Sequence, residues 1–139
     1  MNRAEEQGAG SKGQGDRRAS EPDDTFENLE IWQEAVDLAA RVYEVFRRCN
    51  DFEFRGQIQA AALSVSSNIA EGYERDSNQE LVRFCVIAKA SCGEVRSQVH
   101  VARRVDLVSE EQVIELLTRS KRLSKRIAPY IEVRREKFN

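Results

Sequence analysis

Histidine and cysteine are scarce in this chain of 139 residues, and each shortage excludes a class of protein. The single histidine is His100, and no Gly-rich phosphate loop, cysteine pair or His-Glu helix motif accompanies it. Metal enzymes and hydrolases built on such motifs are therefore disfavoured. We expect a protein that is not an enzyme, with no catalytic residues, no cofactor, no metal site and no small-molecule substrate.

The three cysteines are too few and too scattered to form a disulfide framework, and an odd number fits a reducing compartment. We interpret Cys85 and Cys92 as small buried apolar residues rather than reactive thiols. The chain also lacks an apolar leader segment and any run approaching about 18 apolar residues, so nothing indicates export or a membrane partner. A cytoplasmic location is the expectation.

Positive charge is not in excess over the whole chain, whose formal net charge is −2. A protein without a global basic signal can bind nucleic acid only through a local patch. The first 25 residues are rich in Gly, Ser, Gln and charge and have no periodic apolar residue, which is typical of disorder. We therefore divide the chain into a disordered tail, 1–25, and a folded domain, 26–139. The tail is either a solvating leader or an arm that binds a partner.

Proline is also rare, with two residues in the chain. Apolar residues instead recur every three or four positions, which is the period of an amphipathic helix. This spacing predicts four helices, at about residues 27–48, 52–73 and 77–104 and from 109 onward. The connections between them are short, so we predict an all-α fold, an antiparallel up-down-up-down four-helix bundle.

Several residue types mark where these helices start and stop. Three helix starts carry capping residues: Asn50 or Asp51, Ser77 with Glu80, and Ser109 with Gln112. Gly72 is expected to mark the end of the second helix. Pro129 is expected to kink or end the fourth, because proline lacks the amide hydrogen that a helix interior uses.

The first helix has two adjacent apolar stripes, and the third has a face of unusually small residues. The stripes are Leu29, Trp32, Val36, Ala39, Tyr43 and Phe46, and Ile31, Ala35, Leu38, Val42 and Val45. Together they form a wider apolar arc than one bundle core can use. We therefore expect a homo-oligomer.

A small and polar stripe runs along the second helix at alternating spacings of four and three. Its members are Gln57, Ala61, Ser64, Asn68, Glu71 and Arg75. A polar row beside core residues is either a satisfied buried network or the floor of a groove. Glu71 and Glu94 are the only carboxylates here that suggest an acid/base pair, and nothing in the sequence brings them together.

The C-terminal segment is basic. Between Arg119 and Asn139 the chain has eight basic and two acidic residues, a local charge of +6. Arg119, Arg122 and Arg126 share one helical face and, with Lys125, are the candidate nucleic-acid-binding residues. The alternative is a solvated helix face whose cations lie near the negative end of the helix dipole.

Three ordered motifs resemble a family of bacterial four-helix-bundle proteins, some encoded by intervening sequences within large-subunit ribosomal RNA genes. The segment Ser64–Gly72, SVSSNIAEG, resembles the family's S-I-x-S-N-I-A-E-G motif. Leu29–Trp32 resembles its first-helix signature, and Arg83 and Glu94 belong to a stretch that resembles its third. The motif residues are Trp32, Ser64, Asn68, Glu71, Gly72, Arg83 and Glu94. Where members often have two arginines and a glycine, this chain has Gln59, Ala60 and Ala90.

This resemblance implies an antiparallel bundle that assembles into a ring-like homopentamer. Relatives include the accessory variability protein of diversity-generating retroelements, which binds nucleic acid and a reverse transcriptase. The leading hypothesis is therefore a non-enzymatic homo-oligomeric adaptor that binds RNA, DNA or a nucleoprotein complex containing a reverse transcriptase. The alternative is a protein-protein interaction scaffold with no nucleic-acid role.

Overall fold

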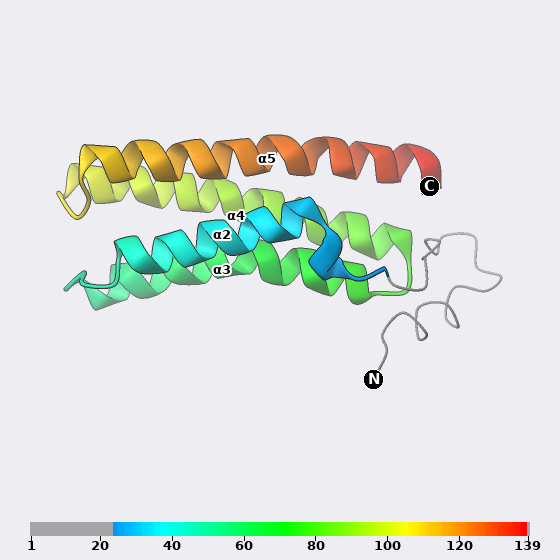
Figure 1. The fold of residues 1–139 in the computed structure, drawn as a ribbon, viewed down its shortest axis with the longest axis horizontal. Coiled ribbons are helices and arrows are strands. Elements are labelled where there is room, and N and C mark those ends of the chain that lie inside the picture. Colours follow the sequence, from blue (N-terminus) through cyan, green and yellow to red (C-terminus); the bar gives the residue numbers. More distant parts are fainter. Residues whose placement is uncertain (1–23, 139) are drawn as a thin grey trace.

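The computed structural model describes residues 24–138, and within this range it contains helices and no strand (Figure 1). A short 3-10 helix, η1 (Phe26–Asn28), precedes four long α-helices: α2 (Glu30–Val45), α3 (Phe52–Glu74), α4 (Asn78–Arg104) and α5 (Glu110–Phe138). The all-α prediction is confirmed, and the four helices match the four predicted segments. The tail predicted to be disordered lies almost wholly outside the described residues.

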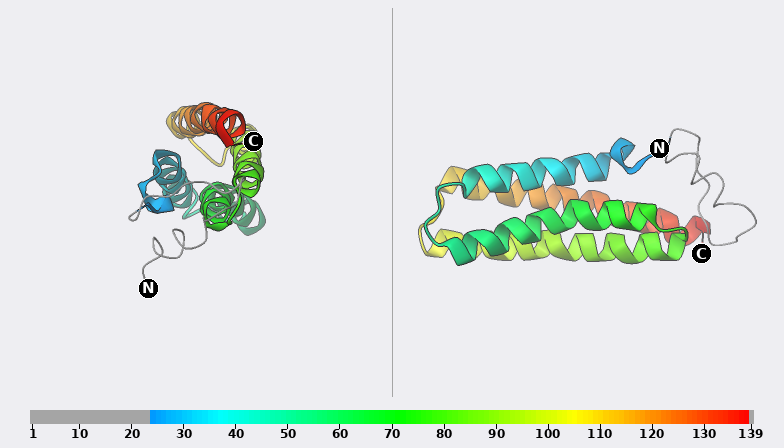
Figure 2. Two further views of the ribbon diagram at one scale, coloured as in Figure 1. Left: turned by 90° about the vertical axis from the view of Figure 1, so that its right-hand side faces the viewer. Right: turned by 90° about the horizontal axis from the view of Figure 1, so that it is seen from below.

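Each helix packs against two others: α2 on α3, α3 on α4, α4 on α5 and α5 on α2. The turns that join α2 to α3 and α4 to α5 lie at one end of the molecule, and the turn between α3 and α4 lies at the other (Figure 1). Contact between α2 and α5 is less extensive than between any other two of these neighbours. The end view in Figure 2 shows these two helices set apart, and we call the junction the α2–α5 seam.

The core is built from the predicted stripes, with one distinction on α2. Of its two apolar stripes, the one containing Ile31, Ala35, Leu38 and Val42 is buried. In the other stripe, Val36 is 36% exposed and Tyr43 is 42% exposed. One bundle core therefore does leave part of the apolar arc of α2 in contact with solvent, as its width predicts.

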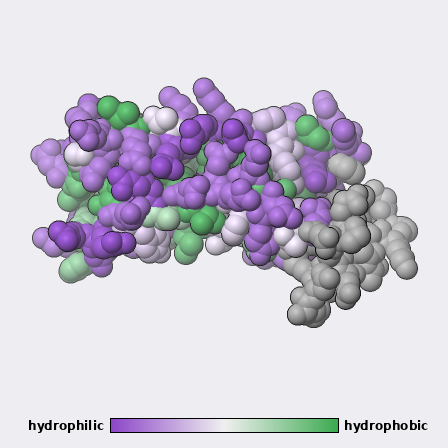
Figure 3. All heavy atoms as spheres, in the orientation of Figure 1, coloured by the Kyte–Doolittle hydropathy of each residue, from purple (hydrophilic) through white to green (hydrophobic). Residues whose placement is uncertain are grey.

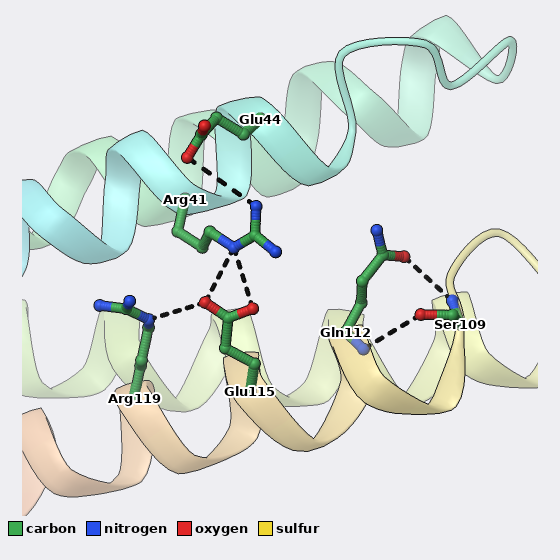
Figure 4. Close-up of polar contacts among 6 residues, drawn as sticks. All are labelled: Arg41, Glu44, Ser109, Gln112, Glu115 and Arg119. Atoms are coloured by element: carbon green, nitrogen blue, oxygen red, sulfur yellow. Dashed lines mark hydrogen bonds and ion pairs between the residues drawn. The ribbon is translucent and has the colours of Figure 1, made fainter.

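The predicted caps open three helices. The Asp51 carboxylate accepts from the Phe54 amide at 3.0 Å, and Ser77 Oγ accepts from the Glu80 amide at 3.1 Å. Ser109 and Gln112 form a reciprocal pair at 3.1 and 3.0 Å, visible in Figure 4. Each cap satisfies an amide that the first helical turn leaves without an intrahelical acceptor.

Gly72 does not end α3, which was the expectation, because the helix continues to Glu74. The glycine has a different use. A Cβ atom at this position would lie 2.8 Å from Phe84 Cβ and 3.2 Å from the Leu81 carbonyl oxygen. Gly72 therefore lets the backbones of α3 and α4 approach closely, and helix termination is left to the residues that follow.

Pro129 does not end α5, which continues through it to Phe138. Proline lacks the amide hydrogen that a carbonyl oxygen one turn earlier would accept. Because Pro129 is exposed, this carbonyl lies on the solvent side of α5. Beyond it, Ile131 is buried and Asn78 Nδ2 donates to the Arg134 carbonyl at 3.0 Å. These tertiary contacts outweigh the local preference of proline.

Candidate functional site

The predicted nucleic-acid-binding arginines lie on the flank of α5 that faces α2, where acidic residues meet them. Arg126 Nη1 is 2.7 Å from Glu34 Oε2 and 3.2 Å from Glu30 Oε2. Arg122 Nε lies 3.6 Å from the other oxygen of Glu34. Two of the predicted phosphate contacts are thus ion-paired across the α2–α5 seam.

The third arginine belongs to a second cluster nearer the middle of the seam (Figure 4). Arg119 Nε is 3.1 Å from Glu115 Oε2. Arg41 Nε, from α2, donates to both oxygens of the same carboxylate at 2.9 and 2.8 Å. The hydrogen bond from Arg41 is the largest cause that holds the pKa of Glu115 below its ordinary value, and burial opposes it. The same bond raises the pKa of Arg41.

The fourth candidate, Lys125, is in a different environment. Its side chain is exposed, and no carboxylate of residues 24–138 lies within ion-pair distance of it. Lys121, one turn earlier, shares this property. The charge of α5 is therefore divided: its arginines face acids of the same chain, and its lysines do not.

A groove of about 500 Å³ lies at one end of the α2–α5 seam. Its apolar lining comes from Leu29, Ile31, Pro129, Tyr130 and Val133, and its charged rim from Glu30, Lys125 and Arg126. Figure 3 shows small, separate apolar areas among the hydrophilic residues that cover most of the molecule in this view.

The polar stripe of α3 forms a hydrogen-bonded network at the contact with α4. Asn68 Nδ2 donates to the carbonyl and to the hydroxyl of Ser64 at 2.8 and 2.9 Å. Ser64 Oγ in turn lies 2.9 Å from Ser91 Oγ of α4. Of the two interpretations offered by the sequence, the satisfied network fits Ser64 and Asn68.

Glu71 continues this stripe but is exposed and pairs with Arg75 at 2.9 Å. Glu94, on α4, is also exposed. Since Ser64 meets Ser91 and Gly72 meets Phe84, Glu94 is level with a turn of α3 roughly 15 Å before Glu71. The two carboxylates therefore do not form an acid/base pair.

The remaining motif residues support packing. Arg83 pairs with Glu80 at 3.0 Å, and its guanidinium lies 5.1 Å from the centroid of the Phe84 ring. The guanidinium of Arg75, at the end of α3, lies 5.0 Å from the same ring. Trp32 meets Phe26 of η1 edge-on, with centroids 5.1 Å apart.

The two cysteines of α4 are buried, and the described residues contain no cluster of metal ligands. Burial raises the pKa of the Cys85 thiol to about 12 and that of Cys92 to about 11. Thiols with such pKa values carry almost no thiolate at neutral pH. Residues 24–138 contain no group of three His, Cys, Asp or Glu side chains that could hold a metal ion, and His100 is exposed.

Sequence reasoning missed the acids that neutralise the seam. The pairing of Glu115 with Arg119 can be predicted from the sequence, because residues four apart on a helix are neighbours. The pairing of Glu34 with Arg126 joins residues 92 apart and depends on the side-by-side placement of α2 and α5. The sequence alone does not contain that information.

The model of the 23S rRNA-intervening sequence protein family matches residues 27–128, which cover all of α2, α3 and α4 and most of α5. The chain belongs to this family. The matched region includes every motif residue and all four candidate binding residues. This match confirms the family resemblance that the sequence motifs indicate.

A solved relative supports the fold of this 23S rRNA-intervening sequence protein. It is a protein of unknown function from the S23 ribosomal protein family of Bacteroides thetaiotaomicron VPI-5482. The two share 19% identity with a TM-score of 0.68, over 73% of this chain and 97% of the other. None of the curated proteins matches. Among the described residues, no helix combines the length and the apolar character that crossing a membrane requires.

Proposed function

We propose that this protein is a non-enzymatic, homo-oligomeric adaptor that binds RNA or DNA, alone or in a complex that includes a reverse transcriptase. The observation that supports this proposal is the divided charge of α5, on which Lys121 and Lys125 remain exposed without an acidic partner among the described residues. Unpaired cations are the groups that release counterions from a phosphate backbone.

The adaptor is an antiparallel up-down-up-down bundle that assembles into a ring-like homopentamer in the cytoplasm. Exposed apolar side chains support self-association: Val36 and Tyr43, seven residues apart on one face of α2, and Leu63 of α3, which is 47% exposed. A ring would repeat a weak basic surface several times, and avidity would then raise its affinity for a polyanion.

Two measurements test this proposal. Light scattering coupled to size-exclusion chromatography should give a mass about five times that of one chain, and a monomer at micromolar concentration would contradict the assembly. Fluorescence anisotropy with a labelled RNA hairpin should show binding at about 50 mM salt and a steep loss of affinity as salt rises. Absence of binding at that salt would contradict the nucleic-acid role.

A protein-interaction scaffold is the second candidate, and one observation favours it. Arg119, Arg122 and Arg126 are paired with carboxylates of their own chain, so these three charges already have a structural use that does not involve nucleic acid. The apolar groove of the α2–α5 seam would then receive a protein segment. The anisotropy measurement separates the two candidates, since a scaffold of this kind ignores nucleic acid.

A further inference from the structure

Helix α4 carries a row of basic side chains. Lys89, Arg96, His100 and Arg103 follow one another at spacings of seven, four and three, which places them on one face of a helix. Between Leu81 and Val105 the only acidic residue is Glu94, and its position in the helical period is on a different face.

Two contacts show that this row borders α5. Arg103 Nε lies 2.7 Å from Glu110 Oε1, and Asn78, on the same flank of α4, bonds to the Arg134 carbonyl at 3.0 Å. These two contacts fix the alignment of α4 with α5. In this alignment Lys89 is level with the turn of α5 that contains Lys121 and Lys125. Figure 2 shows α4 and α5 side by side along their length.

Lys121 of α5 lies on the matching flank. It follows Glu110 by eleven residues, almost three whole turns, so both are on the side of α5 that faces α4. Lys125 is one turn further along and borders the groove of the α2–α5 seam. We therefore call the surface made by Lys89, Arg96, His100 and Lys121 the α4–α5 face.

The α4–α5 face is not neutralised by the described part of the chain. No carboxylate of residues 24–138 lies within ion-pair distance of Lys89, Arg96 or Lys121. Arg96 is half-buried, and its Nη1 has no hydrogen-bond acceptor among these residues. The charges of Lys89 and Arg96 both lower the pKa of the Cys92 thiol between them, against the larger effect of its burial.

We infer that the α4–α5 face, and not the α2–α5 seam, binds the phosphate backbone of RNA or DNA. This inference rests on the proposed function and names the surface that carries it. Lys89 and His100 are roughly 16 Å apart along the helix axis, a length that spans several nucleotides at about 3.4 Å each. Phosphate binding at the seam must first displace Glu30, Glu34 and Glu115, whereas the α4–α5 face needs no such exchange.

Two triple variants of the full chain separate the surfaces, since each removes three positive charges. The first is Lys89→Gln, Arg96→Gln and Lys121→Gln on the α4–α5 face. The matched control is Arg119→Gln, Arg122→Gln and Arg126→Gln in the seam. The probe is a fluorescein-labelled 20-base-pair DNA duplex, read by anisotropy from about 50 to 200 mM salt, with circular dichroism to verify the helical fold.

The α4–α5 variant should lose at least about 30-fold in affinity, and the slope of log affinity against log salt should become shallower by about 2 to 3. The seam variant should stay within about three-fold of the unmodified protein. Equal losses in both variants would overturn the inference, because they would show that net charge alone drives binding. A larger loss in the seam variant would overturn it too.

Failure of the proposed function gives a different result. If the unmodified protein ignores the duplex at about 50 mM salt, the nucleic-acid role fails before either surface is compared. If poly-L-glutamate binds as tightly as the duplex, the α4–α5 face is a site for an acidic protein, and the inference is overturned.

Discussion

Arg41 and Glu115 join the middle of α2 to α5 by a two-point contact, with Arg41 Nε at 2.9 and 2.8 Å from the two carboxylate oxygens. Glu115 also accepts from Arg119, so one carboxylate serves two guanidinium groups. The α2–α5 seam therefore adds a group of ion pairs to the apolar core that all four helices share. Charge makes the seam sensitive to pH and to salt.

Glu115→Gln should lower the free energy of unfolding at pH 7 by roughly 1 kcal/mol or less, because both partners are about one-third exposed and solvent screens them. The folded pKa of Glu115 is below the unfolded value, so its contribution is present above about pH 4.3 and is lost as pH falls through the folded pKa. Urea unfolding at pH 7, 5 and 3 should show the gap between the variant and the unmodified protein closing at the lowest pH. Glu44→Gln is the control, since Glu44 is 3.9 Å from Arg41 and exposed. A gap as large at pH 3 as at pH 7 would contradict the assignment.

Gly72→Ala should destabilise the protein by about 1 to 3 kcal/mol, because the new methyl group would collide with Phe84 Cβ and the Leu81 carbonyl. Gly56→Ala is the matched control in the same helix, since a Cβ there meets no atom within 4 Å. It should stabilise the protein by about 0.5 to 1 kcal/mol through the helix propensity of alanine. Thermal melts of both variants check the pair, and similar shifts would show that no close approach exists at Gly72.

The four helices are predictable because their apolar period and capping pairs are local signals, and Ser109 with Gln112 forms the reciprocal bonds that its spacing indicates. The two errors in helix ends have one physical origin. Rules for Gly72 and Pro129 describe an isolated helix, whereas the Gly72–Phe84 contact and the burial of Ile131 are tertiary. Long-range packing overrides local preference at both positions.

Asn68→Ala should cost about 1 to 2 kcal/mol, because it removes two hydrogen bonds to Ser64 in a half-buried position. Glu71→Ala, in the same motif, should cost about 0.5 kcal/mol or less, since its pair with Arg75 is exposed. A double-mutant cycle of Ser64→Ala and Ser91→Ala should give a coupling of about 0.5 to 1.5 kcal/mol across the two helices. Urea denaturation measures all five variants, including the double variant of the cycle. A coupling of zero would show that the hydrogen bond between Ser64 and Ser91 does not stabilise the contact of α3 with α4.

The folded protein should react with a thiol reagent at one cysteine only. Cys49 is half-buried, whereas burial raises the pKa of Cys85 to about 12 and of Cys92 to about 11. At pH 8 a disulfide reagent should titrate Cys49 first and the other two only on unfolding. Cys49→Ser should abolish the early phase. Early reaction of two thiols in that variant would show that the α4 cysteines are accessible.

The candidate site was only partly predictable. The excess of basic residues on α5 and the shared face of Arg119, Arg122 and Arg126 are properties of one helix, and the structure places all three on that face. Their neutralisation depends on Glu30 and Glu34, which reach Arg126 from 96 and 92 residues away. The row on α4 has a signal in its spacing that the sequence analysis did not use, and its alignment with Lys121 depends on how two helices pack.

The contrast between Gly72 and the α2–α5 seam gives the bundle a stiff half and a compliant half. Helices α3 and α4 meet almost backbone to backbone at Gly72, a contact with no side chain to rotate away. At the seam, long guanidinium and carboxylate side chains bridge the helices, and such side chains have several rotatable bonds. Amide hydrogens of α3 and α4 should therefore exchange with solvent only on global unfolding, and those on the seam side of α2 should exchange earlier, by local opening. Added salt should widen that difference, because it loosens one half of the molecule and leaves the other unchanged.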